Sequence, residues 1–589
     1  MRCSISRGAG TMVRNSGKGK QRLLDRRSFL GVAPAAMTAG LAVPATAHSA
    51  VQPTVATDAI TAAEELAGLD FTADEHMMML NGLDRNRERY DDLRALEIPL
   101  DTEPAVTFRA PFAGHSLTGV ATPHATVPLS KQTLPPVGTP VEELAFLPVT
   151  TLAELIRQQR ISSIELTMMY LGRLKRYGDS LKCVVTLTEE LALDQAARAD
   201  TELRNGQNRG PLHGIPWGAK DLLATKGIRT TWGAKPYETQ VIDHDATVVE
   251  RLNEAGAVLV AKLSMGALAQ GGVWFGGSTR NPWNLERSSS GSSAGPGAAT
   301  AAGLVGFSIG TETRGSIISP SAACGVTGLR PTYGRVSRYG AMALSWTMDK
   351  IGPMCRSVED CALVFNEIYG SDGRDNSVID APFDWSPDGQ LADLRIGYIQ
   401  REFEEPPANA SEERRQRWEV QQPALVAALE SLRGAGAILD PIEMPDFPTN
   451  AISFILTAEA AAAFDDLTRS RGIDRLTSQE SNAWPNTFRT ARFIPAVEYI
   501  RAQRARTLLM RRMNDLMSEY DVFISPSRSN SLGITNLTGN PAIAVKAGFA
   551  DEMPVSLMIT GRLFDEATIL RAALAFERAT PWHTQHPAL

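Results

Sequence analysis

The 589-residue chain is poor in the residues that build metal and disulfide sites. Its five cysteines include no CxxC pair and its eight histidines include no HExxH motif, so a zinc site has no support. Free thiols are favoured over a Cys355–Cys361 disulfide, although that bridge stays open. The formal net charge is −7, and no basic stripe crosses the body of the chain, which gives nucleic-acid binding no electrostatic support. We therefore expect no metal, no cofactor and no nucleic-acid partner.

The apolar run near the N-terminus, residues 32–43, is too short for a comfortable membrane span, which needs about 20 apolar residues. A basic segment, residues 1–27, precedes it and ends in Arg26–Arg27, and small residues follow it. This order is typical of a secretory signal, here residues 1–50, and the arginine pair resembles a twin-arginine signal. A disordered basic tail before an anchoring helix is the alternative. We expect an exported protein, periplasmic or extracellular, with no stable membrane span once the signal is removed.

Two further regions follow the signal. Eight prolines between residues 97 and 145 are too many for a regular element. We expect residues 51–145 to form an N-terminal arm packed on the main domain, with a disordered linker as the alternative. Residues 146–589 alternate apolar strands with helical patterns, which predicts an α/β domain.

Two stretches illustrate the alternation. Residues 182–189, KCVVTLTE, predict a strand, and a long helix is expected over 187–205. Residues 244–264, HDATVVERLNEAGAVLVAKLS, predict a helix, a glycine stop and a β-rich run.

Two serines in glycine-rich turns and one lysine are the candidates for chemistry. Ser292 lies in RSSSGSSAGPG, Ser316 in GTETRGSIISP and Lys220 in HGIPWGAKDL. No histidine lies near either serine in sequence, so a lysine would have to supply the base that a serine nucleophile needs. The apolar neighbours of Lys220 favour partial burial, which lowers the pKa of a lysine. The alternatives are a solvated lysine, a Gly/Ser linker and an ordinary polar turn.

The turn before Ser316 also offers backbone donors. Gly310 and Gly315 suit a tight turn, and the successive N–H groups of residues 313–316 suit an oxyanion hole. The two serines are 24 positions apart, which leaves room for a helix and a returning strand between them.

Taken together, these three segments resemble the amidase signature family. That family has a lysine after a Gly-Ile-Pro-type segment, a serine in a Gly-Gly-Ser-Ser-Gly-Gly loop and a nucleophile in a Gly-Thr-Asp-Ile-Gly-Gly-Ser-type turn. The similarity continues through GLRPTYGRVSRYG, DKIGPMCRSVED, TNLTGNPAIAV and MPVSLMITGRLFDEATIL, and it covers residues 146–589. It implies the family's fold, a large mixed twisted sheet covered by helices on both faces.

The resemblance also implies a role for each candidate residue. Ser316 would be the nucleophile, Lys220 the base, and Ser292 the bridging serine, whose peptide bond is cis in the family. Ser293 would support the loop. The oxyanion hole would use the backbone N–H groups of Thr313, Arg314, Gly315 and Ser316.

The sequence departs from the family pattern around both serines. Ser290 and Ala294 stand where the loop has glycine, and Glu312, Thr313 and Arg314 stand for aspartate, isoleucine and glycine in the turn. The side chain at 314 would either pair with the one at 312 as a structural clamp or bind an acidic substrate, and the clamp is favoured.

The sequence gives the least information about the substrate pocket. The family builds its pockets partly from the segment after the lysine strand, here residues 265–275, which is apolar and implies a hydrophobic or aromatic acyl group. The alternative is that these residues are core. The candidate pocket residues are Met265, Leu268, Gln270, Trp274, Phe275 and Trp346.

The resemblance implies an exported amidase that cleaves a small-molecule carboxamide, and also esters, through an acyl-enzyme. The alternative is a glutaminase-type subunit of a tRNA-dependent amidotransferase, which YGRVSRYG also resembles. A non-catalytic binding protein on the same fold is a third hypothesis. A homodimer stays open.

Overall fold

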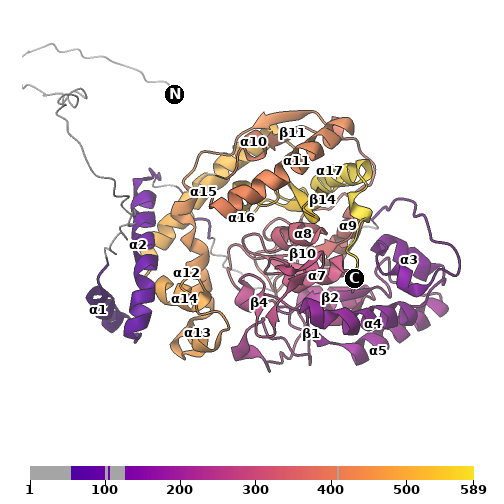
Figure 1. Cartoon of the computed structure of the whole chain (residues 1–589), viewed down its shortest axis with the longest axis horizontal. Helices are drawn as coiled ribbons and strands as arrows, with labels where there is room; N and C mark the ends of the chain where they lie inside the picture. The colour runs from indigo at the N-terminus through magenta and orange to yellow at the C-terminus, as the bar shows by residue number, and fades with distance from the viewer. Residues whose placement is uncertain (1–54, 100–101, 103, 107–126, 408–409) are drawn as a thin grey trace, which may run out of the picture. The chain divides into compact units, whose positions relative to one another are not determined.

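The computed structural model describes residues 55–99, 102, 104–106, 127–407 and 410–589 (Figure 1). The predicted signal, residues 1–50, lies outside them. No helix in the described ranges combines the length and the apolar character needed to cross a membrane.

In these residues, eleven strands form one mixed sheet, and helices pack on both of its faces, which confirms the predicted fold (Figure 1). β2 is parallel to β3 and β8, and β11 is parallel to β12 and β13, whereas the other neighbours are antiparallel. Across the sheet the order is β1 (Val184–Leu187), β3 (Val258–Leu263), β2 (Pro216–Lys220), β8 (Phe307–Glu312), β10 (Lys350–Cys355), β9 (Thr327–Arg330), β14 (Ala542–Ala550), β15 (Met553–Gly561), β13 (Val522–Pro526), β11 (Ile396–Ile399) and β12 (Leu439–Ile442). Four short strands form two separate ribbons: β4 (Val273–Trp274) with β5 (Gly277–Ser278), and β6 (Arg280–Asn281) with β7 (Asn284–Ser288).

The central strands are continuous buried runs because helices cover them on both sides. Every residue of β3, β8 and β10 is buried. The helices of this main layer are α3 (Val149–Arg157), α4 (Ser163–Leu181), α5 (Glu189–Arg204), α6 (Thr247–Glu254), α7 (Ala294–Ala301), α8 (Ile318–Cys324), α9 (Val358–Ile368), α10 (Gln400–Glu404), α11 (Glu412–Gly434) and α17 (Glu566–Ala579).

The local predictions for this layer are confirmed. The predicted strand over 182–189 is β1, and the predicted helix over 187–205 is α5. In residues 244–264, α6 ends just before Gly256, whose φ of 82° marks the predicted glycine stop, and β3 follows.

The short helix α7 lies between the two candidate serines and is made of small residues. All of its residues are buried. A Cβ on Gly295 would stand 2.5 Å from the backbone nitrogen of Ser264, so no larger residue fits there. Small residues therefore let α7 pack directly against the chain that follows β3, and this close packing fixes the direction of the loop that carries Ser292.

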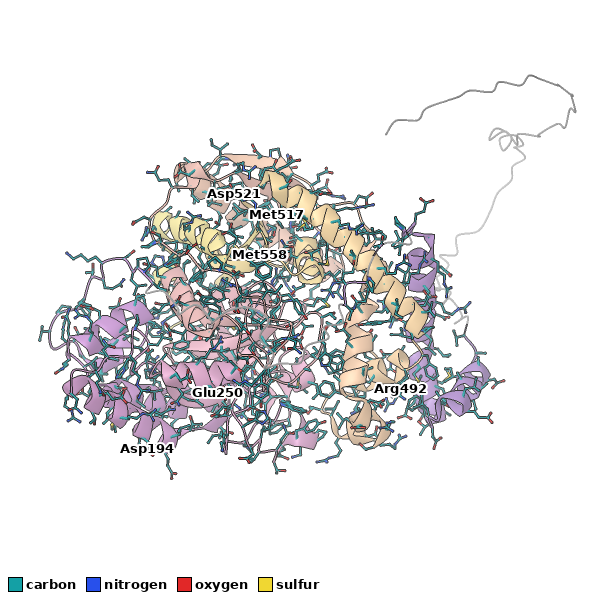
Figure 2. All side chains as sticks on the ribbon, turned by 180° about the vertical axis from the view of Figure 1, so that it is seen from behind. Asp194, Glu250, Arg492, Met517, Asp521 and Met558 are labelled. Carbon is teal, nitrogen blue, oxygen red and sulfur yellow. The ribbon has the colours of Figure 1, made fainter. Side chains whose placement is uncertain are left out.

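The N-terminal helices α1 (Thr57–Ala67) and α2 (Ala73–Ala95) lie beside the helical group of α12 (Phe454–Ala463), α13 (Asp465–Arg469), α14 (Trp484–Ala491) and α15 (Ala496–Glu519) (Figure 1). Glu75 of α2 forms an ion pair of 2.6 Å with Arg489, and Arg94 forms one of 2.5 Å with Glu498. Figure 2 shows this region from behind, with Arg492 between α14 and α15, where it pairs with Asp465. The extent of the arm predicted over 51–145 stays a prediction, because residues 107–126 lie outside the described ranges.

The cysteines of the described residues are buried free thiols, namely Cys183, Cys324, Cys355 and Cys361. The free-thiol interpretation of the last two is therefore confirmed. Cys3 lies outside the described residues.

Candidate active site

Lys220 is the last residue of β2, and its ammonium group lies fully buried among hydroxyl groups. Its Nζ donates to Ser292 Oγ at 2.9 Å, to Ser293 Oγ at 2.9 Å and to Thr311 Oγ1 at 2.8 Å. The Thr311 carbonyl oxygen lies 3.2 Å away as a fourth partner. An ammonium offers three N–H donors, whereas a neutral amine offers two donors and a lone pair that accepts a hydroxyl proton, so the three hydroxyls suit both charge states.

Burial sets the charge state of this lysine. Desolvation lowers the pKa of Lys220 to about 7, although the negative charges of Asp349 and Glu312 oppose the shift. No carboxylate touches the Nζ atom in the described residues, which distinguishes Lys220 from Lys262, another buried lysine, whose Nζ lies 3.3 Å from Asp221. Lys220 therefore exchanges its proton near neutral pH, as a general base must.

The loop that carries Ser292 approaches Lys220 in a fixed conformation. The Gly291–Ser292 peptide bond is cis, as the family resemblance predicts. Ser293 Oγ accepts from the Thr311 backbone N–H at 3.1 Å, and the Ser293 N–H donates to the Ser316 carbonyl oxygen at 3.2 Å. Ser293 thus links the lysine, the end of β8 and the turn of the candidate nucleophile.

Ser316 lies in a half-buried position between β8 and α8. Within the described residues its hydroxyl makes no hydrogen bond. Lys220 is therefore bonded directly to Ser292 and Ser293, whereas Ser316 is connected to them only through its backbone carbonyl. The N–H groups of residues 313–316 likewise donate to no acceptor in the described chain. These four amides are available for a substrate oxygen, as an oxyanion hole requires.

Glu312 shapes this turn from inside the protein. Its Oε2 accepts from the N–H groups of Ile317 and Ile318 at 2.8 and 2.9 Å, and Asn536 donates to its Oε1 at 2.7 Å. Arg330 also donates to Oε1, at 2.9 Å, and both partners of this ion pair are fully buried. Burial alone would raise the pKa of Glu312, but Arg330 and the backbone donors keep it below its usual value.

The predicted clamp between Arg314 and Glu312 is therefore wrong. The carboxylate points into the core, where Arg330 neutralises it, whereas the side chain of Arg314 is exposed. The strand β8 ends at Glu312, and the turn that follows it places the side chain of residue 314 at the surface.

A cavity of about 260 Å³ lies beside the predicted oxyanion hole. Thr313 forms part of its wall and donates its hydroxyl to Asp349 at 2.6 Å. The other oxygen of that buried carboxylate accepts from the N–H groups of Leu344 and Ser345 at 2.8 and 2.9 Å. Asp349 thus joins the oxyanion-hole segment to the segment that forms the opposite wall, and burial raises its pKa.

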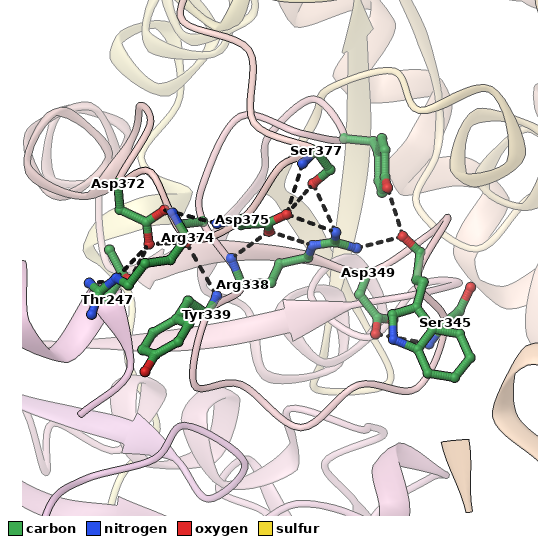
Figure 3. Close-up of polar contacts among 12 residues, drawn as sticks. Thr247, Arg338, Tyr339, Ser345, Asp349, Asp372, Arg374, Asp375 and Ser377 are labelled. Atoms are coloured by element: carbon green, nitrogen blue, oxygen red, sulfur yellow. Dashed lines mark hydrogen bonds and ion pairs between the residues drawn. The ribbon is translucent and has the colours of Figure 1, made fainter. Parts of the chain in front are cut away.

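Two arginines in the cavity wall already have acid partners (Figure 3). Arg338 lies 2.9 Å from Asp375, and Arg374 lies 3.4 Å from Asp372 and also pairs with Glu250. Their charges are neutralised. The exposed aromatic side chains of the wall are Tyr339 and Trp346.

Of the six predicted pocket residues, all within the described ranges, Trp346 alone lines this cavity. Met265 and Leu268 are fully buried in the main hydrophobic core. The Gln270 side chain bonds the backbone of residues 482 and 484, and the Trp274 indole donates to the Lys182 carbonyl. Phe275 is half-buried and packs edge-on against Trp274.

Two residues at the site were missed by the sequence analysis. Thr311 bonds the lysine and Asp349 bonds Thr313, yet no chemistry was assigned to either. Both stand inside motifs that carry the family resemblance, GTETRGS and DKIGP, and that membership was the available signal.

Three comparisons place the chain among known proteins. The family model "Amidase" matches residues 165–570. The A subunit of glutamyl-tRNA(Gln) amidotransferase from Roseiflexus sp. (strain RS-1) is 36% identical over 482 residues, which cover 74% of this chain and 97% of that protein. Its counterpart from Methylococcus capsulatus is 35% identical over 493 residues, covering 74% of this chain and 98% of its own. The crystal structure of native peptide amidase from Stenotrophomonas maltophilia superposes with a TM-score of 0.64 at 29% identity, covering 74% of this chain and 98% of that one.

Proposed function

The chain belongs to the amidase family of amidohydrolases, which act on carbon–nitrogen bonds. We propose that it is an exported enzyme that hydrolyses a small carboxamide through a Ser–Ser–Lys relay. The observation that carries the proposal is the buried Lys220, whose Nζ contacts the hydroxyls of both loop serines at 2.9 Å and whose pKa burial lowers to about 7. A lysine in this state is a base without a counter-ion.

The relay moves one proton in each direction. Ser316 Oγ attacks the carbonyl carbon while its proton passes to Ser292 and the proton of Ser292 passes to Lys220. The backbone N–H groups of residues 313–316 donate to the oxyanion. In the reverse direction Ser292 gives one proton to the leaving nitrogen and takes one back from Lys220. The nitrogen departs as ammonia or an amine, and water then hydrolyses the ester of the acyl-enzyme. Esters are cleaved by the same steps.

We place the acyl group of the substrate in the cavity beside Thr313. Its wall offers the exposed faces of Tyr339 and Trp346 and two arginines whose charges are already neutralised. This supports an uncharged, flat or aromatic acyl group whose size suits about 260 Å³.

The test is a panel of aryl, alkyl and peptide amides with the mature chain alone, compared with the Ser316→Ala and Ser292→Ala variants. The proposal requires release of ammonia or amine, and a loss of about 10³-fold or more in kcat for both variants. Full activity of Ser316→Ala would overturn the site.

A second function is favoured by the sequence relatives, which are amidotransferase subunits. In that case the chain would hydrolyse glutamine only with partner subunits. Glutamine hydrolysis that needs an added partner, together with no turnover of other amides, would establish this alternative. The likeness to a peptide amidase supports the first proposal instead.

Export rests on residues 1–50, which lie outside the described residues. Expression of the full chain in a bacterial host with an intact twin-arginine pathway is expected to yield a shortened protein in the periplasm. Replacement of Arg26–Arg27 by Lys–Lys is expected to leave the full-length chain in the cytoplasm, and unchanged export of that variant would contradict the signal.

A further inference from the structure

Arg314 is a cation without a counter-ion beside the candidate nucleophile. It stands two residues before Ser316 and is exposed. Within the described residues its guanidinium makes no hydrogen bond and no ion pair. A Cβ built on Gly533, in the helix α16 (Asn530–Thr538), would lie 4.0 Å from the Nε and Nη2 atoms of Arg314, so the side chain extends along this helix.

Three other arginines near the site have partners. Arg330 pairs with Glu312, and Arg338 pairs with Asp375. Arg506 donates to the carbonyl oxygens of Leu537 and Thr347. Within the described residues Arg314 differs from these three, because no partner is bonded to its guanidinium. The turn itself does not require an arginine, because the backbone at 314 is not in the left-handed region and the family pattern has glycine there.

A second arginine adds to the positive charge. Burial lowers the pKa of Arg89 in α2, and the positive charges of Arg85 and Arg314 lower it further. Arg85 and Arg89 are four residues apart on one helix, a spacing at which like charges repel. Arg89 donates a hydrogen bond to Asn86 at 3.3 Å, and a bound anion would offset the positive charges that act on it.

We propose that Arg314 recognises a carboxylate on the amide substrate and that the charge of Arg89 adds to the attraction. This inference rests on the proposed amidase function and adds a substrate class to it. A guanidinium binds a carboxylate through two parallel N–H donors, which fixes the orientation of the ligand as well as its charge. Since the chain carries a net charge of −7, a local cation favours the binding of an anionic substrate.

The charges of the cavity wall indicate that this carboxylate and the acyl group bind in different places. Arg338 and Arg374 are neutralised by Asp375, Asp372 and Glu250, so they leave the cavity suited to an uncharged group (Figure 3). Arg314 does not line this cavity, and its guanidinium lies against α16 at Gly533. The carboxylate is therefore placed on the leaving-amine side of the scissile bond, as in an N-acyl amino acid or an acylated aminobenzoate.

The experiment compares matched pairs of substrates. On the amine side, 4-acetamidobenzoate is paired with its methyl ester; on the acyl side, succinyl-4-nitroanilide is paired with its methyl ester. Ratios of kcat/KM within each pair are measured for the native chain and for Arg314→Gly, Arg314→Lys and Arg89→Gln. Arg511→Gln, which changes an exposed arginine of α15 outside the site, is the charge-matched control.

The expected result is that Arg314→Gly lowers the amine-side ratio about 10- to 100-fold through KM, Arg314→Lys restores part of it, and Arg89→Gln lowers it several-fold. Arg511→Gln leaves both ratios unchanged. Equal losses for the acid and the ester, or a change confined to the acyl-side pair, would overturn the inference.

Calorimetric binding separates this inference from the proposed function. The Ser316→Ala protein is titrated with 4-aminobenzoate and with its uncharged methyl ester, which needs no turnover. Preferential binding of the acid that Arg314→Gly removes supports the carboxylate site even if no amide is cleaved. Binding of both compounds alike overturns the carboxylate site while the amidase assay stands.

Discussion

Replacing Lys220 by methionine is expected to abolish activity and yet to stabilise the protein at neutral pH. The pKa of Lys220 falls from its ordinary 10.5 to about 7 because its ammonium is fully buried. This shift corresponds to about 5 kcal/mol of lost stability. Methionine removes that cost and also removes three hydrogen bonds worth about 1 kcal/mol each, so a net gain of about 1–2 kcal/mol follows.

The sign of the effect depends on pH. Below about pH 7 the lysine is protonated in both the folded and the unfolded chain, and the full penalty is present. Between about 7 and 10.5 the folded chain binds fewer protons than the unfolded chain, and the penalty declines as pH rises. The advantage of Lys220→Met should therefore shrink with rising pH and reverse at high pH.

The assay is urea unfolding of both proteins from pH 6 to 10. Lys262→Met serves as the control, because this second buried lysine has a partner: its loss leaves the buried Asp221 without a counter-ion and is expected to cost about 3–5 kcal/mol. A Lys220→Met protein that is less stable than the native chain at pH 6, with a difference that does not vary with pH, would refute the reasoning.

Three further predictions follow from the same geometry. The kcat/KM of the native enzyme should fall tenfold per pH unit on the acid side of about pH 7, because Lys220 is then protonated; a pH-rate profile that is flat between pH 5 and 8 would exclude this lysine as the base. Thr311→Val removes a hydroxyl 2.8 Å from Nζ and should lower kcat about tenfold with KM little changed, whereas a pure rise in KM would point to substrate binding. Glu312→Gln leaves the buried Arg330 without its counter-ion and should lower the free energy of unfolding by about 3–5 kcal/mol in urea titrations; a loss below about 1 kcal/mol would contradict the role assigned to this ion pair.

The sequence motifs identified the segments that hold the candidate catalytic residues, but they did not predict the contacts that the side chains make. Alternating strands and helices predicted the α/β class, and Lys220, Ser292 and Ser293 were picked out by motif and do meet in space. Hydrogen-bond partners that lie far apart in the sequence could not be predicted in this way. Glu312 bonds Arg330 and Asn536, which are far from it along the chain, and only the fold brings them together.

The prediction of the pocket residues was limited for the same reason, because local sequence does not show what a side chain packs against. Met265 and Leu268 have the composition of a pocket lining, but apolar residues after a central strand suit a core equally well, and burial decides between the two. Trp346 lines the cavity because Asp349, which bonds the segment around it, also bonds Thr313, and the local sequence does not encode this second contact.

The central claim is that Ser316 forms a covalent acyl-enzyme with the help of Lys220 and Ser292. The most direct measurement is mass spectrometry of the protein quenched in acid during turnover of an activated amide or ester, followed by peptide mapping. The account predicts an added acyl mass on the peptide that contains Ser316, its absence in Ser316→Ala and its strong reduction in Lys220→Met. An acyl group on another residue, or undiminished turnover by Ser316→Ala, would contradict it.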